Sequence, residues 1–119
     1  MKIAITSKGT DLDSEVDPRF GRAAYILIVD AESLEYEALD NKENANAFQG
    51  AGIQAAIMVS GKGAVALLTG YCGPKAFKTL EAGKIKVAND VAGSVRKAVK
   101  DFNEGTFTFA DGANVEGQW

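Results

Sequence analysis

The stretch AVALLTGYCGP, residues 64–74, joins an apolar run, a turn with two glycines and a proline. The five apolar residues predict a buried strand, and proline is favoured at the first position of a helix. Residues 74–82 then follow a helical pattern that stops at Gly83. Glycines let the backbone approach a ligand closely, and the free N–H groups and positive dipole end of a helix start attract anions. This stretch therefore predicts a strand, a turn and a helix, with an anion site at the turn.

The composition excludes several classes of function. The chain has 119 residues, which suits one domain, and 13 basic against 16 acidic side chains give a formal net charge of −3. That balance argues against general nucleic-acid binding, which needs a basic surface. The chain has no histidine and one cysteine, Cys72. Histidine catalysis, histidine metal sites, cysteine-rich metal sites and internal disulfides are therefore excluded.

The lone cysteine and the N-terminal residues indicate where the protein resides. A lone cysteine fits a reducing cytoplasm. Residues 1–6 predict a strand, lack the apolar stretch of a signal peptide, and no run reaches transmembrane length. We therefore expect a cytoplasmic protein with no membrane partner.

Other segments predict an alternation of strands and helices. An alanine-rich pattern predicts a helix over residues 47–60, with Phe48, Ala51, Ala55 and Val59 on its inner face. The remaining expectations are strands at 1–6, 24–29, 34–39, 64–69 and 85–88, with 24–29 and 34–39 an antiparallel pair, and polar loops at 7–22 and 40–46.

The last helix has the clearest pattern. Val91, Val95, Ala98, Val99 and Phe102 follow helical spacing, Asp90 is placed to cap the start, and Gly105 ends the helix. Residues 1–105 then form the single domain, and residues 106–119 are expected to be a mobile tail.

This order of elements predicts an α/β fold with a mostly parallel sheet. Ligands in such sheets bind beyond the carboxyl ends of the parallel strands. Those ends lead into residues 7–22, 70–73 and 89–90, which we expect to meet at one edge. The start of the first helix, near residues 46–52, is expected to join them.

Three motifs in this order carry a family resemblance. They are DPRFGRA at residues 17–23, GAGIQAA at 50–56, and Thr69-Gly70 with GPKAF at 73–77. Together they resemble the dinitrogenase iron–molybdenum cofactor biosynthesis family over residues 1–105. Within the family, the chain is most similar to a branch from sulfate-reducing bacteria that carries a sulfido-bridged molybdenum–copper cluster.

The resemblance implies a fold and a function. The implied fold is a ribonuclease H-like motif, a five-stranded mixed sheet with helices on both faces. The implied function is binding and transfer of an anionic metal–sulfur cluster, without enzymatic turnover. The favoured cargo is a molybdenum–copper–sulfide cluster, with the iron–molybdenum cofactor or its precursor as the alternative. Some relatives are thought to work beside partitioning-type P-loop ATPases, so such an ATPase is an expected partner.

A cluster that brings its own sulfides needs cations, backbone N–H groups and an apolar wall more than it needs thiolates. Arg19 and Arg22 supply the charge, and the glycines open the backbone. The alternatives are that both arginines pair with Asp13, Glu15 or Asp17, and that Phe20 only holds the loop on the core. The candidate cluster-binding residues are Arg19, Phe20, Gly21, Arg22, Gly50, Gly52, Ile53, Gly70, Tyr71, Cys72, Gly73, Val91, Ala92 and Gly93.

Cys72 is open to two interpretations. It lies just before a helix start, where the dipole lowers the pKa of a thiol. In the first interpretation, the reactive thiol contacts copper or molybdenum or acts as a redox-sensitive group. In the other interpretation, which we favour, it is a small residue beside the site with no bond to metal.

Two alternative functions remain. Asp11, Asp13, Glu15 and Asp17 cluster in the first loop, and paired carboxylates can hold the divalent cations of a hydrolase. Such clusters in loops are usually solvated, and no base or nucleophile is evident nearby. The other alternative is an adaptor or sensor that docks to a P-loop ATPase, which needs the same pocket.

Overall fold

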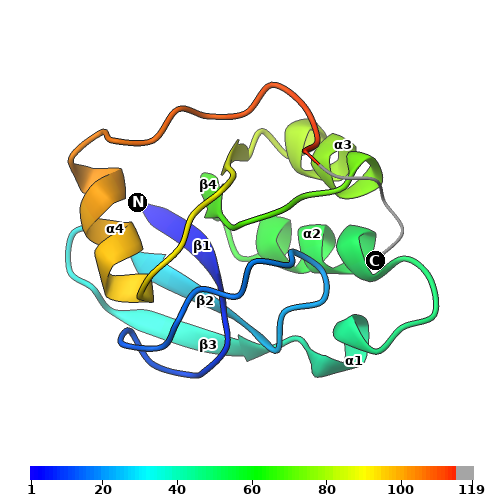
Figure 1. Cartoon of the computed structure of the whole chain (residues 1–119), viewed down its shortest axis with the longest axis horizontal. Helices are drawn as coiled ribbons and strands as arrows, with labels where there is room; N and C mark the ends of the chain where they lie inside the picture. Colours follow the sequence, from blue (N-terminus) through cyan, green and yellow to red (C-terminus); the bar gives the residue numbers. More distant parts are fainter. Residues whose placement is uncertain (115–119) are drawn as a thin grey trace.

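The sheet is built around β1 (Lys2–Ser7) in a computed structural model that describes residues 1–114 (Figure 1). The strands lie in the order β3-β2-β1-β4-β5. The pairs β1–β2 and β2–β3 are antiparallel, whereas β1–β4 and β4–β5 are parallel. The other four strands are β2 (Tyr25–Asp30), β3 (Tyr36–Asp40), β4 (Ala66–Leu68) and β5 (Lys86–Ala88).

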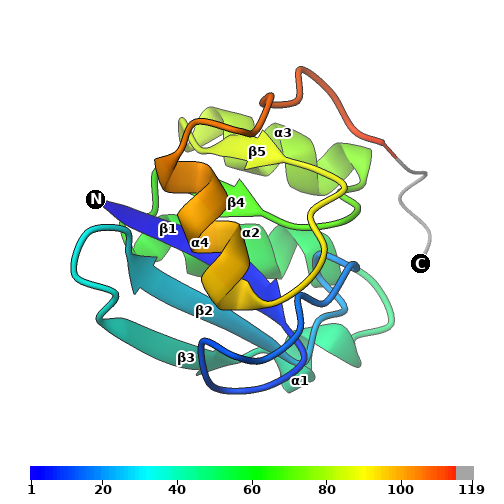
Figure 2. The ribbon, with the colours of Figure 1, turned by 60° about the vertical axis from the view of Figure 1, so that its left-hand side comes forward.

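The helices cover the two faces of this sheet unequally. In Figure 2, α4 (Val95–Asn103) lies on one face, and α2 (Ala51–Gly61) and α3 (Pro74–Ala82) lie on the other. Alternate residues of β1 explain this arrangement, since Ala4 packs on the α2 and α3 side while Ile3 and Ile5 pack on the α4 side. Burying both faces of β1, β2 and β4 requires their near-continuous apolar sequences.

The predicted α/β class is confirmed, as are the five mixed strands with helices on both faces. The bounds of α3 agree with the predicted 74–82, and Ala76, Phe77 and Leu80 are buried. The mostly parallel sheet expected from the order of elements is wrong, because only two of the four neighbouring pairs are parallel. The long first loop returns the chain antiparallel to β1.

Two expectations before α2 are corrected. The predicted polar loop 40–46 contains the short helix α1 (Lys42–Ala45), which has no buried residue and hence no apolar pattern. The helix predicted from residue 47 begins at Ala51, after Gly50 in the left-handed conformation with φ +79°. Phe48 therefore lies outside the helix and is 94% exposed, instead of facing the core.

The start of α4 is also corrected. Asp90 does not cap this helix, because its φ of +62° turns the chain away from helical geometry. The helix begins at Val95, and the cap is Ser94, whose hydroxyl accepts a hydrogen bond from the N–H of Lys97 at 3.0 Å. Val91 is buried, but it is buried as part of a loop. Its spacing from Val95 matched the helical period without being part of the helix.

The C-terminal segment, residues 106–114, runs from α4 across the molecule and past α3 (Figures 1 and 2). The N–H of Ala110 donates to the carbonyl of Val87 at 2.7 Å. The ring of Phe109 meets that of Phe102 edge-on, with centroids 6.4 Å apart. The expected mobility of residues 106–119 stays a prediction. Residues 115–119 of this segment lie outside the described part of the chain.

Crossing a membrane takes a helix of about 20 predominantly apolar residues. None of the helices within residues 1–114 combines the length and the apolar character that crossing a membrane needs.

Candidate functional site

The first loop and the turn after β4 lie against each other. The N–H of Tyr71 donates to the carbonyl of Pro18 at 2.6 Å, and the N–H of Phe20 donates to the carbonyl of Tyr71 at 3.1 Å. A Cβ at Gly70 would lie 2.7 Å from the Cα of Pro18. Only glycine permits this approach, so Gly70 holds two loops together and does not face open space.

The loop after β5 joins the same edge. The N–H groups of Asp90 and Val91 donate to the carbonyls of Gly70 and Thr69 at 2.9 and 3.0 Å. The N–H of Val16 donates to the carbonyl of Gly93 at 2.8 Å. The predicted convergence of the three loops is therefore what the structure shows, with backbone hydrogen bonds linking each loop to another.

The start of α2 completes this edge. Gly21 has a φ of +93°, and a Cβ there would lie 2.8 Å from the Cα of Gly52. A Cβ at Gly52 would in turn lie 3.0 Å from that of Ala76. These contacts place the first turns of α2 and α3 side by side, and they place the first turn of α2 against the first loop.

A hollow of about 460 Å³ opens where the two helices begin. Both helices start at a glycine, Gly50 for α2 and Gly73 for α3, and neither start has a side-chain cap. Because first-turn N–H groups have no acceptor within their own helix, donors from two helices line one hollow. The lining residues are Phe20, Arg22, Phe48, Gln49, Gly50, Ala51, Gly52, Ile53, Gly73, Lys75 and Ala76.

The charge of this lining is positive. Among residues 1–114, the charged residues that line it are Arg22 and Lys75, and none of the lining residues is a carboxylate. Phe20, Phe48 and Ile53 supply apolar surface. Two cations, two uncapped helix starts and an apolar wall favour a compact anion.

Arg22 is held in place by the backbone. One nitrogen of its guanidinium, Nη1, donates to the carbonyls of Ala45 and Ala47 at 2.8 and 2.7 Å. These bonds tie the loop after α1 to the first loop. Arg22 thus has the predicted place at the hollow and also a structural role.

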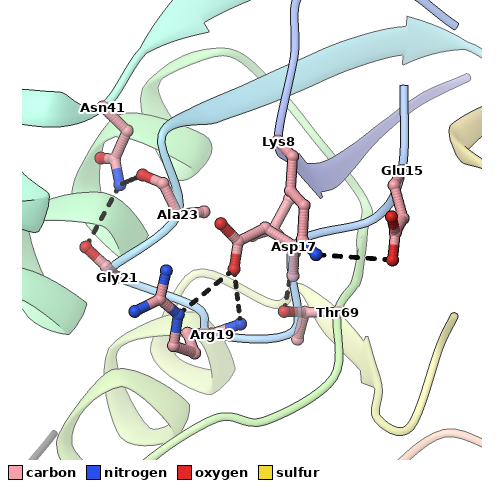
Figure 3. Close-up of polar contacts among 9 residues, drawn as sticks. Lys8, Glu15, Asp17, Arg19, Gly21, Ala23, Asn41 and Thr69 are labelled. Carbon is pink, nitrogen blue, oxygen red and sulfur yellow. Dashed lines mark hydrogen bonds and ion pairs between the residues drawn. The ribbon is translucent and has the colours of Figure 1, made fainter. Parts of the chain in front are cut away.

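Arg19 does not line the hollow. Its Nε lies 3.5 Å from Oδ1 of Asp17, and its side chain is half exposed (Figure 3). The same carboxylate oxygen accepts the N–H of Arg19 at 3.1 Å. The expected alternative, pairing with Asp17, is therefore found for Arg19. Figure 3 also shows the amide of Asn41 donating to the carbonyls of Gly21 and Ala23, which holds this loop from the other side.

The remaining candidate residues fall into two groups. Phe20 lines the hollow but is also buried in the core, so the two roles proposed for it coexist. Ile53 lies in the wall of the hollow. The candidates that do not line it are Arg19, Gly21, Gly70, Tyr71, Cys72, Val91, Ala92 and Gly93.

Cys72 is fully buried. Burial raises the pKa of its thiol to about 12, which is opposite to the lowering expected from the helix start. The cause is desolvation, which disfavours the charged thiolate. The protonated thiol lies 3.7 Å from the carbonyl of Gly73.

Acidic residues of the first loop pair with basic side chains and do not form a metal-binding cluster among residues 1–114. The Arg96 guanidinium bonds to Asp13 at 2.8 Å and holds the pKa of that carboxyl below its usual value. Glu15 pairs with Lys8, and Asp17 accepts from Arg19. Within residues 1–114, no three His, Cys, Asp or Glu side chains lie close enough to hold a metal ion. The arrangement gives the hydrolase alternative no metal centre in this part of the chain.

Sequence reasoning missed several residues of the hollow. Lys75 stands in the first turn of α3, where a cation opposes the helix dipole, and that mismatch is the signal that could have identified it. Phe48 and Gln49 lie in the stretch 46–52 that is expected to join the site, but neither is among the candidate residues. Ala51 and Ala76 carry no chemical signal in the sequence.

Comparisons with known proteins show the family and the fold of this chain. Residues 1–105 match the protein-family model described as dinitrogenase iron-molybdenum cofactor. The apo form of the orange protein from Desulfovibrio gigas is 47% identical to this chain. The alignment covers 96% of each chain, and the two structures superpose with a TM-score of 0.93. The family predicted from the three motifs is thus confirmed, as is the predicted likeness to the orange protein.

Other solved structures share the fold. A putative NifB protein from Thermotoga, described as belonging to the DUF35 family, is 36% identical over 98% of each chain, with a TM-score of 0.82. A putative dinitrogenase from Methanocaldococcus jannaschii has a TM-score of 0.70, covering 94% of this chain and 96% of its own. At 19% identity, that likeness concerns the fold alone. Among curated proteins, no match to this chain is found.

Proposed function

The chain belongs to the dinitrogenase iron-molybdenum cofactor family, and from that premise we propose that it binds and carries an anionic metal–sulfur cluster. Family membership and the likeness to the orange protein support a cofactor-binding or carrier role. We propose further that the protein holds the cluster without a side chain bonded to metal, and that it transfers the cluster instead of turning over a substrate.

One observation carries this proposal: two uncapped helix starts, Arg22 and Lys75 line a single hollow to which residues 1–114 contribute no carboxylate. A sulfide-bridged cluster is a compact polyanion whose sulfurs accept hydrogen bonds. The first-turn N–H groups of α2 and α3 supply the donors, and the two cations balance the charge. The residues present therefore fit such a cargo.

The apolar part of the lining strengthens these interactions. Phe20 and Ile53 lower the local dielectric, so each remaining charge and donor acts more strongly than in water. The hydrogen bonds that Arg22 makes to the carbonyls of Ala45 and Ala47 hold its guanidinium before the cargo arrives. Preorganised donors of this kind need little further ordering on binding.

The favoured cargo is a molybdenum–copper–sulfide cluster, which the branch resemblance implies, and the 47% identity to the orange protein supports that branch. The iron–molybdenum cofactor or its precursor stays the alternative. The P-loop ATPase partner, the cytoplasmic location and the ribonuclease H-like description stay predictions that no feature of residues 1–114 tests. Arg19, exposed beside Asp17, would supply charge only at the rim.

The test is reconstitution of the purified protein with tetrathiomolybdate and copper without oxygen, followed by desalting. We expect visible sulfide-to-metal absorption and molybdenum and copper in fixed ratio by elemental analysis. Lys75→Glu places an anion in the hollow and should lower the retained molybdenum about tenfold or more.

The matched control is Lys78→Glu. Lys78 lies on the same helix, is exposed and does not line the hollow, so this variant has the same net charge as Lys75→Glu. It should retain nearly as much cluster as the unchanged protein. Equal retention in the two variants, or no binding by the unchanged protein, would contradict the proposal.

A further inference from the structure

Asn114 meets the turn after β4 through three hydrogen bonds. Its Oδ1 accepts the N–H of Cys72 at 2.8 Å, and its Nδ2 donates to the carbonyl of Gly70 at 3.0 Å. Its own N–H donates to the carbonyl of Cys72 at 3.2 Å. One residue, 42 positions along the chain from Cys72, thus contacts the backbone on both sides of Tyr71.

The chemistry of these contacts is specific to an amide side chain. The N–H of Cys72 needs an acceptor and the carbonyl of Gly70 needs a donor, and asparagine presents both on one short side chain. An aspartate would keep the acceptor and lose the donor. An alanine would lose both and leave the N–H of a fully buried residue without this partner.

The path of the chain brings Asn114 to this place. Residues 106–114 leave α4 and pass over β5 toward the start of α3 (Figures 1 and 2). The contacts of Phe109 with Phe102 and of Ala110 with Val87 anchor the segment on the way. The segment lies beyond residues 1–105, the part matched by the family model.

The turn that Asn114 contacts borders the hollow. Gly73, which follows Cys72, lines the hollow and is the cap residue of α3. The N–H of Cys72 bonds to Asn114, and Asn114 itself is not among the residues that line the hollow.

We propose that residues 106–114 form a strap that belongs to the cluster-binding site, with Asn114 as its positioning residue. Asn114 holds the backbone from Gly70 to Cys72 and thereby fixes Gly73 and the open start of α3. The strap's role in cargo binding rests on the function proposed above. Its contact with the turn does not.

The test uses the full chain with Asn114→Ala, Asn114→Asp and the control Asn103→Ala. The side chain of Asn103 also donates to a backbone carbonyl, that of Ala31 at 2.7 Å, so its loss controls for removal of an ordinary amide bond. Amide hydrogen exchange at Cys72 is measured without cargo. Retained molybdenum is measured after reconstitution with tetrathiomolybdate and copper.

We expect Asn114→Ala to speed exchange at Cys72 about tenfold and to lower retained molybdenum about threefold or more. Asn114→Asp should speed exchange at Cys72 by less, because it keeps the acceptor for the Cys72 N–H, and Asn103→Ala should change neither exchange nor retention. Unchanged exchange at Cys72 would overturn the strap itself. Faster exchange with equal or higher retention would overturn its positioning role. If the unchanged protein retains no molybdenum, the proposed function fails together with the strap's role in it, while the exchange result still tests the contact.

Discussion

The helices of this protein begin in two different ways. α4 begins at Ser94, whose hydroxyl accepts the N–H of Lys97. α3 begins at Gly73 with almost the same backbone conformation, φ −75° and ψ 169° against −79° and 155°, but has no side chain to act as a cap. α2 also begins at an uncapped glycine.

The charged side chains around the start of α4 also differ from those around the starts of α2 and α3. Near the start of α4, Arg96 pairs with Asp13, and Lys97 pairs with Asp101. Within the described part of the chain, the hollow at the starts of α2 and α3 is lined by two cations and by no carboxylate. A helix start that a side chain caps serves the fold, whereas an uncapped start bordered by cations suits an anion.

The first prediction concerns how far the electrostatic effect of the uncapped start of α3 extends. If its dipole dominated at Cys72, the thiol would ionise easily, but burial raises the thiol pKa to about 12. We expect the thiol of the folded protein to react with DTNB at pH 8 about a thousandfold more slowly than after denaturation in guanidinium. Rapid labelling of the folded protein would contradict this result. The raised pKa also makes the stability of the folded protein depend on pH. Because the folded state holds the thiol neutral, the stabilisation is complete at pH values below the pKa of the unfolded thiol and is lost as the pH rises from there toward 12.

The second prediction tests the packing that brings the open starts together. Gly21→Ala adds a Cβ 2.8 Å from Gly52 at a φ of +93° and should lower the free energy of unfolding by about 2–4 kcal/mol. Gly50→Ala is the matched control, because its φ of +79° is also positive but a Cβ there meets nothing within 4 Å. It should cost only about 1 kcal/mol. Urea unfolding measures both values, and equal losses would show that conformation alone, without the close approach, determines the effect.

The third prediction converts one kind of helix start into the other. Gly73→Asp introduces a cap and a negative charge in the backbone conformation that Ser94 already uses. It should stabilise α3 by about 0.5–1 kcal/mol and reduce retained molybdenum about tenfold, because the side chain occupies the donors. Ser94→Ala should cost about 1 kcal/mol and leave retention unchanged. The comparison would fail if Gly73→Asp bound the cluster as well as the unchanged protein.

Local patterns predicted some elements of the fold well and others poorly. The helix at 74–82 has a proline start, a glycine stop and an amphipathic face, and its bounds agree with the structure. Val91 has the spacing of a helical residue, but the positive φ values of Asp90 and Gly93 turn the chain before the helix begins. A pattern of apolar residues reports burial, and it does not distinguish a buried loop from a helix. Phe48 is a different case: its side chain is 94% exposed, and it lies before Gly50, whose left-handed conformation precedes the start of α2.

The candidate site was predicted as a region more accurately than as a set of side chains. The convergence of the loops follows from strand direction, which the sequence pattern indicates. Whether an arginine faces a ligand or a neighbouring carboxylate depends on distances of a few ångströms. Arg22 and Arg19 are three residues apart, yet the first lines the hollow and the second pairs with Asp17.

The sequence by itself determined the class of the fold, the glycine-rich turns and the family, because these depend on local propensity and on short motifs. Only the tertiary structure decided that Gly21 meets Gly52, that Lys75 joins Arg22 at one hollow, and that Asn114 returns to the turn at Cys72. These pairs are 31, 53 and 42 residues apart in the chain. Contacts at such separations arise from the packing of the whole core, and no local pattern of residues records them.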